Sequence, residues 1–68
     1  MSKESYFLVY CMERYRFFKG LSGEEVSELF KKYNLFDYVK NSFEVLHIMG
    51  DVRIVQDIDD YIARIENS

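Results

Sequence analysis

Two helix boundaries lie within three residues of each other near position 20 of this chain. A periodic apolar run over residues 4–19 ends at Gly20, and glycine readily adopts the left-handed conformation in which many helices stop. Ser22 then has the pattern of a helix N-cap, with Glu25 three residues later to complete a capping box. The sequence therefore predicts a first helix, a very short turn, and a second helix over about 23–33.

Further local signals support both helices. Ser2 is placed to cap the first one, and Leu21 and Val26 stand at the two positions of a hydrophobic staple around the start of the second. Lys31 and Lys32 near the end of the second helix suit the negative end of its dipole.

The second half of the chain predicts two more helices. Asn34 interrupts the pattern and is placed to cap a third helix, along which apolar residues recur at helical spacing until Gly50. Residues 52–55 are short and β-branched, which indicates either an extended segment or a helix start. Asp57 and Asp60 form a second capping pattern before a last helix. We therefore predict an all-α fold, a small bundle of about four short helices in a single domain over residues 1–68, with an extended segment at 52–55 left open.

The composition is apolar for so short a chain. Of the 68 residues, 49% are hydrophobic and 18% are aromatic. A chain of this size buries a modest share of its surface, so either the core is dense or some of the apolar surface meets a partner.

The charge, the single cysteine and the lack of long apolar runs limit the possible partners and cellular location of the protein. The net charge is −3 and the pI is near 5.0, which disfavours nucleic-acid binding. A single cysteine excludes an internal disulfide. The N-terminal MSKES is not typical of a secretion signal, and no apolar run reaches the length of a membrane span. We expect a cytoplasmic protein with no membrane partner.

The first helix carries aromatic residues on two sides. At 100° per residue, one arc holds Phe7, Leu8, Cys11, Tyr15 and Phe18, and the nearly opposite side holds Tyr6, Tyr10 and Phe17. One interpretation is a central helix that touches neighbours on both sides. The other is a stripe that faces a partner, because exposed Tyr and Phe are preferred interface anchors.

The interaction hypothesis names two groups of partner-binding residues. The first is Tyr6, Tyr10 and Phe17, and the second is Tyr38, Val45 and Met49 on the side of the third helix expected to face away from the core. Self-association as a homodimer is its simplest form, since a symmetric dimer would cover the excess apolar surface.

Nucleic-acid binding is the alternative hypothesis. The stretch RYRFFKG interleaves bases with rings, but Tyr15 and Phe18 point to one side of the helix and Phe17 to the other. Residues 23–49 could also form a helix-turn-helix regulator, with Tyr38, Lys40 and Asn41 in a groove. The glycine-containing turn of that motif is missing, and the would-be recognition helix carries acidic residues.

No motif predicts catalysis or a cofactor. The single histidine, His47, sits at the edge of an apolar face, and Cys11 lies on the main apolar arc with no base near it in sequence. The acids Asp57, Asp59 and Asp60 lack the spacing of a calcium loop. We therefore expect no enzyme activity, no cofactor and no metal.

The order of motifs resembles a known bacterial family. GLSGEEVSELFKKYNLFDYV, then VLHIMG, then RIVQDIDDYI are similar to the family catalogued as domain of unknown function 3791, and the resemblance covers nearly the whole chain. Ile48 departs from it, since the family often has a threonine after the histidine.

The resemblance implies an all-α domain without assigned catalytic residues. It also implies a setting, because members are often encoded beside, or joined to, proteins with ADP-ribosyltransferase-like domains. On that basis the chain is expected to be a small partner of an effector or toxin, resembling an antitoxin.

Overall fold

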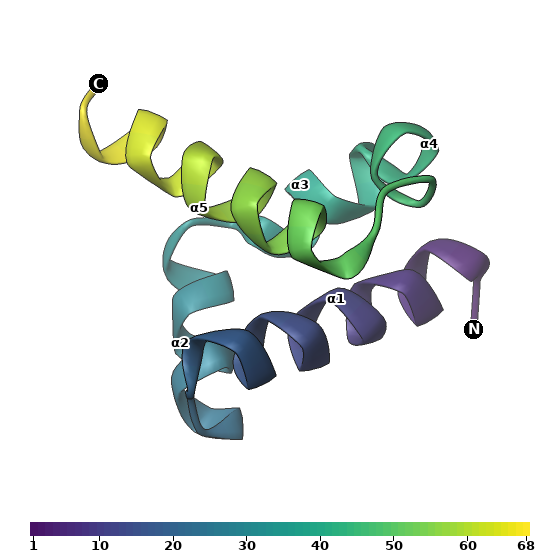
Figure 1. Ribbon diagram of the computed structural model, residues 1–68, viewed down its shortest axis with the longest axis horizontal. Coiled ribbons are helices and arrows are strands. Elements are labelled where there is room, and N and C mark those ends of the chain that lie inside the picture. Colours follow the sequence, from purple (N-terminus) through teal and green to yellow (C-terminus); the bar gives the residue numbers. More distant parts are fainter.

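The chain folds into five helices and contains no strand. The computed structural model describes residues 1–68, and Figure 1 shows the arrangement of the helices. They are α1 (Lys3–Lys19), α2 (Gly23–Lys32), α3 (Leu35–Asn41), α4 (Phe43–Leu46) and α5 (Asp51–Glu66). The prediction of a small all-α bundle is confirmed.

The ends of α1 are set by the predicted local signals. The Ser2 hydroxyl oxygen accepts a hydrogen bond from the Ser5 backbone N–H at 3.2 Å. At the other end Gly20 has φ +67°, the left-handed region that favours glycine, and the Leu21 N–H bonds to the Arg16 carbonyl at 3.0 Å. Both helix-end predictions are confirmed.

The predicted capping box at the start of α2 is present. The Glu25 N–H donates to the Ser22 hydroxyl oxygen at 3.0 Å, and the Ser22 N–H donates to the Glu25 carboxylate at 2.8 Å. Val26 is buried and Leu21 packs against the same core, as staple residues would.

The predicted third helix is broken. A bend at Ser42 divides it into α3 and the four-residue α4. The bend keeps Leu46 buried and brings the Phe43 ring edge-on to Phe7 of α1, with centroids 5.4 Å apart. Asn34 occupies the predicted N-cap position of α3, but its side chain does not cap the helix. It adopts a left-handed conformation with φ 52°, makes no capping bond, and donates its side-chain amide to Asp37 instead.

The last helix begins earlier than predicted. Gly50 is its N-cap, so residues 52–55 are helical, and Asp57 lies within α5 rather than at its start. The extended alternative and the capping role of Asp57 and Asp60 are therefore wrong. Burial explains the difference, because Ile54, Val55 and Ile58 enter the core together from one side of a helix, and this outweighs the β-preference of the branched residues.

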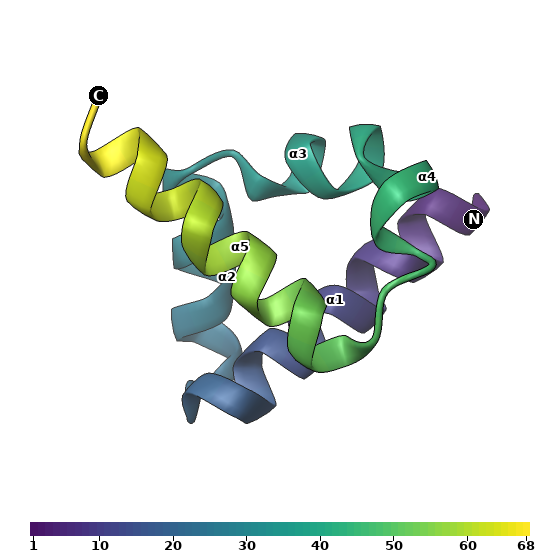
Figure 2. The ribbon, with the colours of Figure 1, turned by 45° about the horizontal axis from the view of Figure 1, so that its top comes forward.

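All five helices contribute to one hydrophobic core. Phe30 of α2 is fully buried within it and meets Tyr15 and Phe36 edge-on at centroid distances of 6.1 and 5.8 Å. The buried residues are Cys11, Tyr15, Val26, Phe30, Leu35, Val39, Leu46, Ile54, Val55 and Ile58. The turned view in Figure 2 shows α5 running diagonally across the molecule, and α1 packs against both α3 and α5. In Figure 1, α1 runs across the lower part of the molecule, and α3 and α5 lie above it.

Candidate protein-interaction surface

Three aromatic side chains of α1 project from the side that no other helix covers. Tyr6 is 65% exposed, Tyr10 is 45% exposed and Phe17 is 66% exposed, whereas Cys11 and Tyr15 on the opposite side are buried. We call these three residues the outer stripe. The interpretation of α1 as a central helix with neighbours on both sides is therefore wrong, and the aromatics of the first predicted group face solvent together.

The tyrosines inside the fold differ from those of the outer stripe in their hydrogen bonds. Tyr15 donates its hydroxyl to Asp59 at 2.6 Å, and Tyr38 donates to Asp57 at 2.6 Å. Both carboxylates belong to α5, so these bonds attach α5 to α1 and α3. The hydroxyls of Tyr6 and Tyr10 have no hydrogen-bond partner within the chain, which leaves both as free polar groups on an aromatic surface.

The inner tyrosines act as structural donors. Burial, followed by the hydrogen bond to Asp57, raises the pKa of Tyr38 to about 12. Burial and the Asp59 carboxylate raise the pKa of Tyr15 in the same direction. Both phenols stay protonated near neutral pH and keep donating to α5. The acidic cluster at 57–60 thus supplies hydrogen-bond acceptors for tyrosines, a role that sequence spacing alone did not indicate.

Charged side chains border the outer stripe. Glu13 lies on the same side of α1 and pairs with Arg16 at 3.2 Å. Arg14 lies over the Phe17 ring, with its guanidinium carbon 5.1 Å from the ring centroid, and also pairs with Asp51 of α5 at 3.0 Å. The surface therefore has aromatic rings and the Glu13 carboxylate along one line of α1, with the cations of Arg14 and Arg16 at its edge.

The second predicted group is not one surface. Val45 is 59% exposed, but Tyr38 and Met49 pack against the core. The Tyr38 ring stacks on Tyr61 of α5, with centroids 3.8 Å apart and ring planes 16° apart. The prediction that all three residues face away from the core is wrong, because side chains of α5 cover Tyr38.

Sequence reasoning missed several exposed apolar residues. Phe18, expected on the same arc as Cys11 and Tyr15, is 43% exposed, and Val52 of α5 is 61% exposed. Val9 is 50% exposed and lies three residues after Tyr6, so its helical spacing could have assigned it to the outer side of α1. Ile48 is 78% exposed in the turn after α4. No periodic pattern marks Ile48, since it lies outside any helix.

The cysteine and the histidine, two residue types often used in catalysis, both make contacts within the fold. Burial raises the pKa of the Cys11 thiol to about 12, and this side chain has no exposed surface. Nδ1 of His47 lies 2.7 Å from the Phe43 carbonyl oxygen, and its ring stacks on Phe43 with centroids 4.5 Å apart. No three His, Cys, Asp or Glu side chains come close enough together to hold a metal ion.

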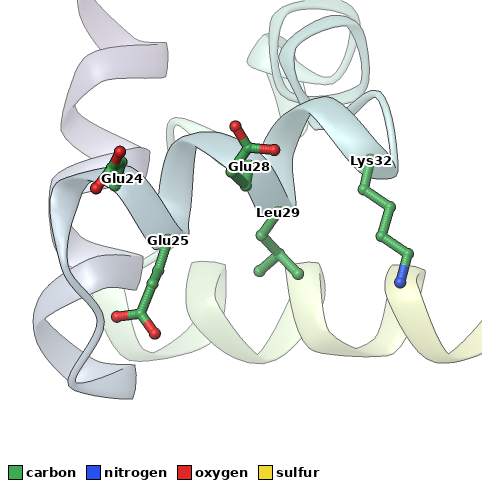
Figure 3. A pocket seen from close by; sticks show the side chains of 5 residues that line it. All are labelled: Glu24, Glu25, Glu28, Leu29 and Lys32. Atoms are coloured by element: carbon green, nitrogen blue, oxygen red, sulfur yellow. The ribbon is translucent and has the colours of Figure 1, made fainter.

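The largest hollow of the molecule lies on α2 and is formed by that helix alone. Figure 3 shows its lining, in which Leu29 is the one apolar residue. The other side chains are Glu24, Glu25, Glu28 and Lys32. Because one helix supplies every lining residue, the hollow is an open acidic surface rather than an enclosing pocket.

None of the helices has both the length and the apolar character needed to cross a membrane.

Comparison with known proteins identifies the family. No curated protein and no solved structure matches the chain. The model of the family described as "Protein of unknown function (DUF3791)" matches residues 6–64, which is most of the 68 residues. The chain therefore belongs to the DUF3791 family, as its motifs predict.

Proposed function

We propose that this protein is a non-catalytic interaction module that binds another protein through the outer stripe. The observation that carries the proposal is the exposure of Tyr6, Tyr10 and Phe17 together on one side of a helix whose other side forms the core. Tyr10 stacks on Phe7 and Phe17 packs edge-on to Phe18, but much of each ring still faces water. Clustered exposed aromatics of this kind are the usual anchors of protein interfaces.

The surroundings of the stripe support this function. Aromatic anchors at the centre with charges at the rim are the common anatomy of a specific interface. Arg14 and Arg16 supply rim charges, and Glu13 adds an acidic group within the line of rings. Charges of both signs restrict the partners that can dock.

An effector is the partner that the family resemblance suggests. A protein with an ADP-ribosyltransferase-like domain as partner would make this chain an antitoxin-like binder.

The helix-turn-helix alternative has less support. Its recognition helix would be α3, which has only seven residues. Of the three residues expected to read a groove, Tyr38 is hydrogen-bonded to Asp57 and stacked on Tyr61. Lys40 and Asn41 are the exposed ones.

The proposal is tested by a pull-down from lysate of the native host after nuclease treatment. The tagged wild-type chain is compared with Tyr10→Glu/Phe17→Glu. A matched control, Ser27→Glu/Ala63→Glu, adds the same two charges at exposed positions on α2 and α5. We expect one stoichiometric protein that survives nuclease, is lost with the stripe variant and is kept with the control.

Two outcomes would contradict the proposal. Equal recovery of every protein by the stripe variant and the wild type would mean that the stripe is not the binding surface. Loss of helical circular dichroism in the stripe variant would mean that Tyr10 and Phe17 stabilise the fold, as core residues do.

A further inference from the structure

We propose that the outer stripe pairs two copies of this chain, with α1 packed antiparallel against α1 of the second copy. The inference rests on the proposed function of the stripe and names its partner. The pair would be symmetric about the middle of α1, between Cys11 and Met12, so each copy presents the same surface to the other.

The spacing of the stripe fits a helix pair. Tyr6, Tyr10, Glu13 and Phe17 follow one another at intervals of four, three and four residues, which is the spacing of the seam positions in a coiled coil. All four are exposed on α1, and Cys11 and Tyr15 on the opposite side of the helix pack in the core. A second helix laid along this line would therefore meet a continuous seam.

Charge complementarity selects the antiparallel direction. A parallel pair would set Glu13 against Glu13, and two like charges facing each other repel. In the antiparallel pair Tyr6 lies opposite Phe17, and the Tyr10 hydroxyl lies opposite Glu13 of the second copy. Arg16 donates a hydrogen bond to Oε2 of Glu13, and Oε1 of Glu13 has no hydrogen-bond partner in the chain.

The Tyr10–Glu13 contact would repeat a kind of contact that the fold already uses three times, one of them from Tyr33 to Glu66. Inside the chain, Tyr15 and Tyr38 each donate to an aspartate of the helix packed against them. Tyr10 is an unpartnered donor, and Glu13 has a free acceptor oxygen. The two-fold symmetry would satisfy both groups in both copies.

The area of the stripe predicts a reversible dimer. A fully exposed aromatic side chain offers about 200 Å², so the exposed fractions of the three rings amount to about 350 Å² in each copy. The rings of two copies would then bury about 700 Å², below the roughly 1,200–2,000 Å² of a stable interface. We expect association that depends on protein concentration.

Sedimentation equilibrium over a wide range of concentrations tests the dimer. Wild type is expected to shift from monomer to dimer, and Glu13→Lys is expected to weaken the dimer by at least about tenfold, because it removes a charged hydrogen-bond acceptor from both halves of the seam. The matched control is Glu28→Lys, an exposed charge reversal on α2 that should dissociate like wild type. Wild type that stays monomeric at every concentration overturns the proposal.

Disulfide trapping tests the direction of the pair. A mixture of Tyr10→Cys chains with Glu13→Cys chains should form the mixed disulfide in preference to either homodimer. Cys11 is fully buried and should not compete. Homodimeric disulfides of each variant in preference to the mixed one would overturn the antiparallel direction.

The two proposals fail separately. A monomeric chain whose stripe still captures a different protein from lysate would overturn the second copy as partner and leave the proposed function intact. A chain that neither dimerises nor captures a protein through its stripe would overturn both.

Discussion

The two sides of α1 carry similar residues and end in opposite environments. Tyr15 on the inner side is 3% exposed and donates to Asp59, whereas Tyr6 on the outer side is 65% exposed and its hydroxyl has no hydrogen-bond acceptor in the chain. Both are tyrosines on the same helix. The comparison shows that aromatic content does not by itself mark a core in so small a protein. On α1, the buried tyrosine is the one whose hydroxyl donates a hydrogen bond to a carboxylate.

The largest expected difference between the two sides is in stability. Tyr15→Ala should lower the free energy of unfolding by about 3–5 kcal/mol, because it leaves a cavity beside Phe30. A chain this small has little more than that to lose. Tyr6→Ala, the same substitution on the outer side, should cost about 0.5 kcal/mol or less.

Urea denaturation followed by circular dichroism measures both variants. The chains must be dilute enough to be monomeric, because association would stabilise the folded state of the wild type. A loss for Tyr6→Ala comparable to that for Tyr15→Ala would remove the distinction between the two sides.

A smaller difference is expected when the hydroxyl alone is removed. Tyr15→Phe should cost about 1–2 kcal/mol, since it keeps the ring and deletes a part-buried hydrogen bond to a charged acceptor. Asp59 would keep its ion pair with Lys19 at 2.8 Å, which limits the loss. Tyr10→Phe should leave the unfolding of the monomer unchanged. If Tyr15→Phe proves equally neutral, the hydrogen bond to α5 contributes nothing to the stability of the fold.

A further difference, which depends on pH, is expected in alkaline solution. The pKa of Tyr38 is about 12 in the folded chain and near 10 when unfolded, so the folded state holds this proton more tightly. The resulting stability is fully present below pH 10 and is lost as the pH rises from about 10 to about 12. The raised pKa of Tyr15 acts in the same direction.

Urea midpoints measured at rising pH check the size of this loss. Tyr15→Phe/Tyr38→Phe should be less stable than wild type at neutral pH and should lose less stability between pH 10 and 12. A double variant that loses as much as wild type would assign the alkaline sensitivity to other groups.

The helix ends near position 20 could be predicted because their bonds are local. The Ser22–Glu25 capping box and the left-handed Gly20 involve residues within a few positions of each other, so they form in almost any tertiary setting. The start of α5 could not be predicted in the same way. Asp57 has the sequence context of a cap, but burial of Ile54 extends the helix back to Asp51.

By itself, the sequence determined the all-α class, the first two helices, and the presence of two aromatic sides on α1. Only the tertiary structure decided which of those sides is covered. The physical reason is that both sides offer apolar area, and α5 supplies acceptors such as Asp59 to only one of them. The same packing placed Tyr38 against α5 and left Tyr6, Tyr10 and Phe17 in solvent, because a helix bundle of 68 residues has too few elements to cover α1 on every side.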